Sequence, residues 1–409
     1  MTSTLPDREP PPAPKYDGMA RLYVLMATAF LDMVGALMVV PLLPFYADTL
    51  GASKFEVGVL VSSFSAAQLL SAPLWGRVSD RYGRKPTLLI GLGASVVAYV
   101  VFAFADTFWL LLVSRIVQGA GGGTVGVIQA YVADAVEPGK RSKALGWLSA
   151  ATNAGVVLGP MIGSAAARWG TAAPGLLAAA LSVVNMFFAS RYLMESHGVD
   201  ARRKAKTARS PWQMVVRVAA HWYEPPSRLI WIYAVAIGAF YGVTAYLVFF
   251  LEQQFGVDVG TIGFFFAYMG GLSVLIRIWL LGWVVDRLGE PRTVRLGAVL
   301  LALGLGLTPF TTTLPVLAMT VALIPLGTAF TFPAVTALLS QVIGEHERGV
   351  YMGVQQTYGG ILRVIYPLYA GWAWEQFGGA KVPFITSAIF VLSTLLLGRG
   401  MEKYQKTGH

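Results

Sequence analysis

The chain has 409 residues, of which 56% are hydrophobic and 13% are charged, and its formal net charge is +10. A soluble protein of ordinary composition carries about 25% charged residues, so the composition excludes that class. The sequence contains no cysteine, which excludes disulfides, zinc–thiolate sites and thiol nucleophiles.

Apolar runs of helical length recur from one end of the chain to the other. Each run can cross a hydrocarbon core of ~30 Å, whereas a lipid-facing barrel would need alternating polar and apolar residues. We therefore predict an all-α membrane protein with twelve transmembrane helices. The predicted spans are 20–46, 55–75, 86–105, 107–132, 143–167, 172–193, 229–251, 260–283, 293–311, 314–342, 349–371 and 382–400.

Two sets of six spans are expected, at 19–194 and 228–401, with a cytoplasmic tail at each end of the chain. The first tail, 1–18, contains five prolines and no apolar core, which predicts disorder rather than a cleavable signal peptide. The second tail is the short segment 402–409.

The connection between the two sets, 195–227, is basic in its first part. Its second part has Met214, Val215, Val218 and Trp222 at helical spacing. Two interpretations stay open for this cytoplasmic linker. Either it is plain chain whose charge fixes the topology, or it ends in an amphipathic helix that lies along the inner membrane surface.

Lysine and arginine are distributed unevenly between the two sides of the membrane. The predicted outer loops hold only Lys54, Arg168 and Lys381, and three arginines lie inside spans, so the other 25 of the 31 basic residues lie on one side. This positive-inside bias places both termini in the cytoplasm. It also accounts for the net charge without a nucleic-acid partner.

The first span contains the run FLDMVGALMVVPLLPFY, residues 30–46, with Asp32 near its start. At 1.5 Å per residue, Asp32 lies roughly 18 Å from the inner end of the span, and Arg115 of the fourth span lies at roughly the same depth. Ionisable groups inside a membrane are costly and mark functional sites by default. Both residues are therefore candidates for a functional role.

A charged loop after the second span, GRVSDRYGRKP (76–86), recurs after the eighth as GWVVDRLGEPR (282–292), which indicates an internal repeat. Its charges either only fix the topology or form a latch that breaks during a conformational cycle, and the recurrence favours the latch. Its glycines allow tight turns, and its Asp can cap a helix or pair with Arg across the halves. The candidate latch residues are Gly76, Asp80, Arg81, Gly83, Arg84, Asp286, Arg287 and Gly289.

With these loops and three span motifs, the sequence resembles the major facilitator superfamily from Arg21 to about Gly400. FLDMVGALMVVPLLP resembles the tetracycline-efflux type of twelve-span drug:proton antiporter, and LLVSRIVQGAGGG (111–123) resembles the family's fourth-span motif. The resemblance implies two pseudo-symmetric six-helix bundles around a central cavity, and alternating access. NAGVVLGPMIG (153–163) resembles the fifth-span antiporter motif, carried here by Gly155, Gly159, Pro160 and Gly163.

Small residues let helices approach closely and proline bends a helix, so the fifth span is expected to influence closure of the outer gate. In the resembled fold the first and fourth helices line the cavity, which makes an Asp32–Arg115 pair plausible. Burial favours the protonated carboxyl and a nearby Arg favours the carboxylate, so a change of access would move a proton. A static structural ion pair is the competing interpretation.

The second half has Arg277 in the eighth span and Arg363 in the eleventh, with no acid clearly inside a span. Glu252, at the outer end of the seventh span, is the nearest candidate. We expect Arg363 to face the cavity and Arg277 to snorkel inward. A cavity with more Arg than acid favours an anionic or zwitterionic substrate, unless Arg363 pairs with Asp32 across the halves.

Our first interpretation is a monomeric, proton-coupled antiporter of the bacterial inner membrane that exports small apolar organic compounds. An exporter or flippase of an anionic amphiphile, such as a lysolipid or phosphorylated lipid, is the alternative, and a non-transporting receptor is a third. An enzyme is disfavoured because no nucleophile–base set appears, and no cofactor or metal is expected. The candidate substrate-binding residues are Phe30, Gln68, Tyr241, Tyr246, Phe330, Gln355, Tyr358 and Arg363.

Overall fold

The computed structural model describes residues 18–122, 124–136, 140–193, 195, 211–344 and 347–401. The predictions for residues 1–17, 196–210 and 402–409 lie outside this part of the chain. The N-terminal half contains α1 (Gly18–Val39), α2 (Leu43–Thr49), α3 (Lys54–Tyr82), α4 (Arg84–Ala103), α5 (Phe108–Gly121), α6 (Thr124–Ala135), α7 (Arg141–Ala167) and α8 (Ala173–Tyr192).

The helix α9 (Pro211–Ala220) precedes the C-terminal half. That half contains α10 (Pro225–Phe255), α11 (Ile262–Leu275), the π-helical turn η3 (Ile276–Leu280), α12 (Leu281–Leu307), the 3₁₀ turn η4 (Thr308–Phe310), α13 (Leu314–Val342), α14 (Arg348–Phe377) and α15 (Lys381–Leu397). Every regular element among the described residues is thus a helix, as predicted.

The helices follow the predicted spans. Nine helices of the described part are long and apolar enough to cross a membrane, and one of these, Ile262–Phe310, covers two predicted spans. The remaining two predicted spans coincide with α14 and with the shorter apolar helix α15. The prediction of an all-helical membrane protein is confirmed.

Three predicted spans differ from single continuous helices. The first is divided by a turn between α1 and α2, where Pro44 in the first turn of α2 cannot donate a backbone hydrogen bond. The fourth is divided between α5 and α6, after a run of glycines that ends α5 at Gly121. The eighth passes through η3 and continues into α12 as far as a kink at Gly289.

The internal repeat is visible in the backbone of the two charged loops. Gly83 has φ 110° and ψ 162°, and Gly289 has φ 74° and ψ 161°. Residues with side chains rarely adopt these positive φ values, so each turn requires glycine. The two loops therefore fold alike at equivalent positions of the two halves.

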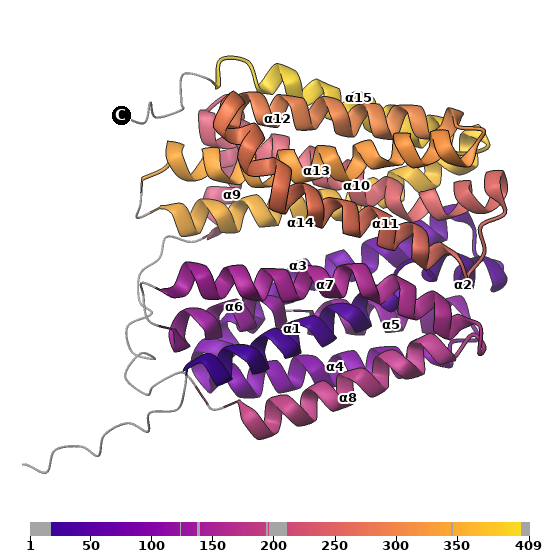
Figure 1. Cartoon of the computed structure of the whole chain (residues 1–409), viewed down its shortest axis with the longest axis vertical. Helices are drawn as coiled ribbons and strands as arrows, with labels where there is room; N and C mark the ends of the chain where they lie inside the picture. The colour runs from indigo at the N-terminus through magenta and orange to yellow at the C-terminus, as the bar shows by residue number, and fades with distance from the viewer. Residues whose placement is uncertain are drawn as a thin grey trace, which may run out of the picture.

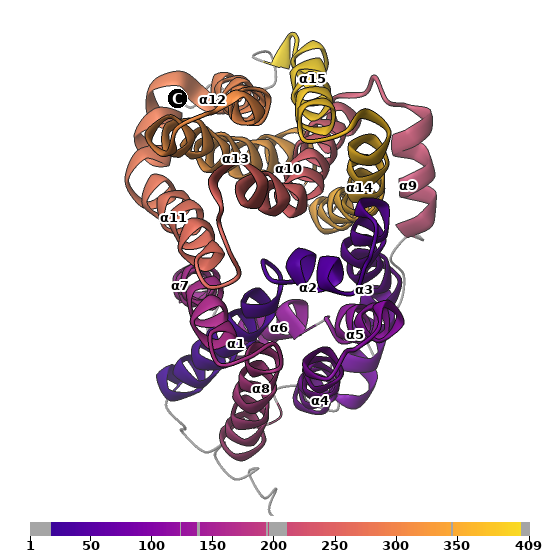
Figure 2. The ribbon, with the colours of Figure 1, turned by 90° about the vertical axis from the view of Figure 1, so that its right-hand side faces the viewer.

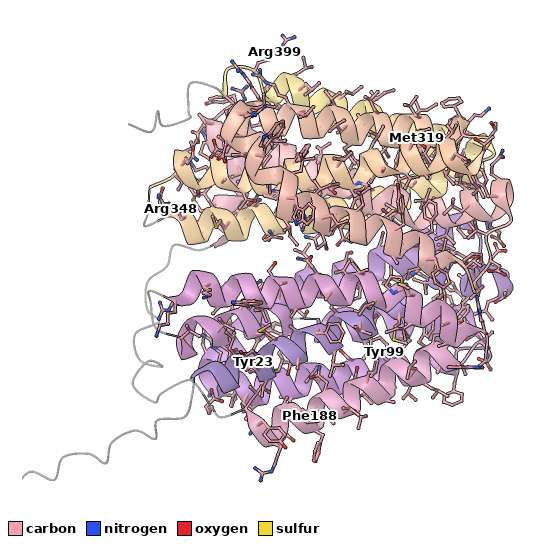
Figure 3. All side chains as sticks on the ribbon, viewed as in Figure 1. Tyr23, Tyr99, Phe188, Met319, Arg348 and Arg399 are labelled. Carbon is pink, nitrogen blue, oxygen red and sulfur yellow. The ribbon has the colours of Figure 1, made fainter. Side chains whose placement is uncertain are left out.

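Large apolar side chains cover the outside of the helices. Phe188 and Met319 point away from the bundle (Figure 3), and their exposed fractions are 46% and 65%. Such extensive apolar exposure would be unfavourable in water and is favourable in lipid. The chain is a multi-pass integral membrane protein.

Among the described residues, the contacts between the two halves run from one end of the molecule toward its middle, where Gly360 of α14 approaches Leu69 of α3. The end where α1 begins and α15 ends is the predicted cytoplasmic end, and there the halves diverge (Figure 1). One apolar cluster spans both halves and includes Tyr46 and Tyr246, near the opposite end. The clusters around Leu22 and around Met401 are each confined to one half. The structure is thus closed at the predicted outer end.

Candidate functional site

The closed end contains two equivalent contacts between the halves, α3 with α14 and α7 with α11 (Figure 2). In the first, a Cβ added at Gly58 would lie 2.5 Å from the carbonyl oxygen of Pro367. Ser62 Oγ donates a hydrogen bond of 2.6 Å to the carbonyl of Val364. A glycine is required here because the backbones of the two helices touch.

The second contact repeats this arrangement with the halves exchanged. A Cβ added at Gly263 would overlap the carbonyl of Pro160, and the Gly263 amide donates to Ser164 Oγ at 2.8 Å. Each half thus presents a proline carbonyl to a glycine of the other. We call these two contacts together the outer seal.

Side chains of α10 and α14 complete the outer seal. The Tyr246 hydroxyl donates to the carbonyls of Lys54 and Pro367, both at 2.9 Å. The Phe55 amide donates to Glu375 Oε1 at 2.8 Å. Tyr246, predicted to bind substrate, therefore lies buried in the seal in this conformation.

The fifth-span motif lies on α7 and faces two helices. A Cβ at Gly155 would lie 2.8 Å from the carbonyl oxygen of Phe30, one at Gly159 would lie 2.9 Å from that of Val34, and Gly163 packs likewise on α1. Pro160 faces α11. The motif thus joins the helix that carries Asp32 to the outer seal.

Asp32 lies on α1, is partly exposed, and its Oδ2 accepts a hydrogen bond of 2.9 Å from Thr124 Oγ1. Thr124 is the first residue of α6, directly after the break in the fourth span. The fourth span thus supplies a hydroxyl donor to an intramembrane carboxylate.

Arg115 on α5 is 2% exposed, and its guanidinium carbon lies 5.6 Å from the centroid of the Phe102 ring. Its Nε has no hydrogen-bond partner among the described residues. No ion pair joins it to Asp32 in the described part of the chain, so the expected contact is not made in this conformation. Tyr99 is close enough to both charges to interact with them.

The charged loops bond within their own halves. Arg84 Nη1 lies 2.9 Å from Asp80 Oδ1, and the backbone amides of Arg84 and Lys85 donate to Glu195 at 2.9 and 3.2 Å. In the second loop, the Arg287 guanidinium carbon lies 4.2 Å from the Trp283 ring centroid. A latch across the halves stays a prediction, since the loops lie at the end where the halves diverge.

For the remaining candidate latch residues, the described part of the chain contains no ion pair with the other half. Arg81 lies over its neighbour Tyr82, with 5.4 Å between the guanidinium carbon and the ring centroid. An added Cβ at Gly76 would meet nothing within 4 Å. Asp286 and Gly289 belong to the kinked turn of α12.

Glu195 caps the N-terminus of α4, a role that the sequence did not suggest. We expect Glu195→Ala to lower the unfolding free energy by about 1 kcal/mol, because two amide donors lose a charged acceptor. The measurement is thermal unfolding of the purified protein in detergent. Glu195→Gln, which keeps one acceptor oxygen, should lose less, and an unchanged midpoint in Glu195→Ala would contradict the capping role.

The eight candidate substrate residues divide into two groups. Phe30, Gln68, Tyr241 and Arg363 are at least partly exposed, and Gln68 Nε2 donates to the carbonyl of Gly122 at 3.2 Å. The other four are buried in this conformation and do not form part of an accessible site. They are Tyr246, Phe330, Gln355 and Tyr358.

Three of these buried side chains contact specific residues of the same half or of α9. Phe330 packs in a core with Ile276, and Gln355 Nε2 donates to Thr336 Oγ1 at 3.2 Å. The Tyr358 hydroxyl donates to the carbonyl of Val215 in α9 at 2.9 Å. Position along a span gave no indication of which helix face is buried.

Residues of α9 pack on the C-terminal half. Met214 and Val218 are 5% and 1% exposed and belong to the apolar cluster that includes Tyr358. A helix is thus present in the second part of the linker, and its Met214 and Val218 side chains cover protein; its position at the membrane surface stays a prediction. Trp222, beyond the end of α9, remains 57% exposed.

Two related halves of membrane-spanning helices, joined at one end and carrying charges inside the spans, define a secondary transporter. The chain belongs to the Major Facilitator Superfamily, whose family model matches residues 25–367 and 279–404. This confirms the resemblance found in the motifs.

Two bacterial relatives are resistance proteins. The class C tetracycline resistance protein of Escherichia coli is 29% identical, over 81% of this chain and 84% of that protein. Multidrug resistance protein 2 of Bacillus subtilis (strain 168) is 28% identical, over 85% of this chain and 87% of that protein. The crystal structure of the human organic anion transporter MFSD10 (TETRAN) has a TM-score of 0.69 at 23% identity, covering 94% of this chain and 100% of that one, and shares the fold.

Proposed function

We propose that this protein is a proton-coupled antiporter that exports small organic compounds of largely apolar character. The carrying observation is Asp32, a partly exposed intramembrane carboxylate bonded to Thr124 at the N-terminus of α6. Burying such a group in a membrane costs free energy, so its presence there indicates a functional role. The resistance proteins among the relatives support export of drug-like compounds.

The proposed cycle alternates access to Asp32. In the present conformation the outer seal is closed and the halves diverge at the predicted cytoplasmic end. Substrate enters from the cytoplasm while Asp32 releases its proton there. The seal at Gly58 and Gly263 then opens, substrate leaves, and Asp32 takes up a proton from outside. The hydrogen bond from the Thr124 hydroxyl stabilises the carboxylate in the inward state.

The distribution of basic residues supports a bacterial inner-membrane location with both termini in the cytoplasm. The charged loops at 76–86 and 282–292 are then cytoplasmic. They serve as the inner latch, which holds the halves together only when the outer seal is open. The chain acts as a monomer in this scheme, because each half supplies one side of the pathway.

A second candidate is export of an anionic amphiphile. It is favoured by Arg277 and Arg363, which lie in the C-terminal spans without an acid at their depth. The fold shared with an organic anion transporter is in keeping with it. A non-transporting receptor is less well supported, since it gives no role to Asp32.

The test is reconstitution into vesicles that contain a pH dye, screened with matched cationic, neutral and anionic aromatic compounds. We expect substrate addition to cause proton flux in the opposite direction, absent from empty vesicles. Proton flux in the same direction as substrate would indicate symport and contradict antiport. If none of the compounds causes proton flux, the result would favour the non-transporting receptor.

A further inference from the structure

We propose that the C-terminal half binds the anionic group of the substrate through Arg363, with Tyr241, Gln356 and Arg277 completing the site. The inference rests on the proposed transport function and names its substrate class. That class is an organic anion, in which a carboxylate or phosphate is attached to an apolar body.

Arg363 is held in place but leaves most of its donors unused. Its guanidinium carbon lies 5.4 Å from the centroid of the Tyr241 ring, and Nη2 donates to Gln356 Oε1 across a long 3.4 Å. Its Nε has no hydrogen-bond partner among the described residues. This Nε is buried, so it is not a donor that an entering ligand reaches in this conformation. A guanidinium carries five N–H donors in a planar fork, so the terminal Nη groups are the donors left for a ligand.

Gln356 is itself oriented by a neighbour. Its Nε2 donates to the Tyr233 hydroxyl at 3.2 Å, and its Oε1 lies 3.4 Å from that hydroxyl and 3.4 Å from Arg363 Nη2. Tyr233 lies on α10 and Gln356 on α14, so the contact joins two helices of the same half. The fork of Arg363 is therefore held by Gln356 and Tyr241, and the side chain is partly exposed.

Arg277 is a second positive charge in the C-terminal spans. It lies in the π-helical turn η3 and is exposed. π-Helical turns inside longer helices occur frequently at functional sites. Tyr241 is 42% exposed, so its ring is available to an apolar body next to the anion.

The C-terminal half provides no counter-charge at this depth. Among the described residues of its helices, Arg277 and Arg363 lie between two sets of carboxylates, one near each end of the membrane. These terminal carboxylates are Asp286, Glu290, Glu347, Glu252 and Glu375. An arginine in a water-poor site needs a partner, and no ion pair joins either arginine to Asp32 in the described structure.

The chemistry of the donors selects the ligand. A planar fork matches the two oxygens of a carboxylate or phosphate, and such charge-assisted pairs are stronger than neutral hydrogen bonds. A cationic compound would instead meet two like charges. An organic anion entering from the open end would therefore replace the counter-ion that the protein lacks.

The experiment measures equilibrium binding to the purified full-length protein by quenching of tryptophan fluorescence. The probes share one ring system: 2-naphthoate, 2-naphthyl phosphate and neutral 2-naphthamide. We expect at least one anion to bind about tenfold or more tightly than the amide, and Arg363→Gln to remove that difference. Arg191→Gln, which deletes an exposed positive charge at the end of α8, should bind like the wild type.

The two anions distinguish carboxylate from phosphate as the preferred group. If Arg363→Gln does not purify as a folded monomer, Arg363→Lys keeps the charge but not the fork and should weaken binding by a smaller factor. Equal binding of the anions and the amide, or full binding by the Arg363 variants, would overturn the proposal.

Vesicle transport separates this inference from the proposed function. Proton-linked transport of neutral or cationic compounds that survives Arg363→Gln would overturn the anion site and leave the antiporter intact. Anion binding that depends on Arg363, without any proton-linked transport, would support the site and contradict the antiporter.

Discussion

Asp32→Asn is expected to abolish proton-driven transport while leaving the protein folded. The amide cannot exchange a proton near neutral pH, but its carbonyl oxygen can still accept the hydrogen bond from Thr124. Substrate-dependent proton flux in vesicles should fall to the level of empty vesicles. Exchange of labelled for unlabelled substrate, which needs no net proton movement, should persist.

The matched control for this variant is Asp106→Asn, the same change at an exposed residue outside the predicted spans. It should transport like the wild type. Undiminished pH-dependent transport in Asp32→Asn would contradict the assignment of Asp32 as the proton site. Loss of both proton flux and exchange would point instead to a purely structural role.

Gly263→Ala is expected to prevent closure of the outer seal. The added methyl group would overlap the backbone carbonyl of Pro160, which cannot rotate away as a side chain would. Overpacking of this kind costs about 1–3 kcal/mol, enough to shift a balanced two-state equilibrium by about 5- to 150-fold. The variant should therefore populate the outward-open state and transport slowly.

Because the chain has no cysteine, spin labels can be attached at introduced cysteines without background. A pair at Asp106 and Leu314, one near the outer end of each half, reports the separation of the halves by pulsed electron resonance. Gly263→Ala should lengthen this distance. Gly270→Ala on the same helix is the control, since its added Cβ would find its nearest neighbour at 3.5 Å. Identical distance distributions in both variants would refute the seal.

Much of the fold could be predicted from the sequence. Apolar run length gave the spans, and the recurrence of the charged loop gave the two related halves. The breaks in the first and fourth spans were not foreseen. They depend on where a proline or a run of glycines interrupts backbone hydrogen bonding, and hydropathy does not measure this.

The candidate site was predictable only in part. Asp32 was identified because a carboxylate inside an apolar run is conspicuous. Its partner Thr124 was missed, since a threonine in a span is unremarkable until the helix break places it. Gly58 and Gly263 occupy equivalent places in the repeat, but glycines are too frequent in this chain for sequence alone to select them.

The outer seal has a consequence for how the transporter responds to its surroundings. The contacts described across it are hydrogen bonds and close approaches to backbone carbonyls, and among the described residues none is an ion pair between the halves. Dissolved salt screens exposed charges but has little effect on buried neutral contacts. Raised salt should therefore leave the contacts at Gly58, Gly263 and Tyr246 unchanged. It should weaken only the charged contacts of this end, which are the Phe55 amide on the Glu375 carboxylate and the Lys54 ammonium over the Phe249 ring.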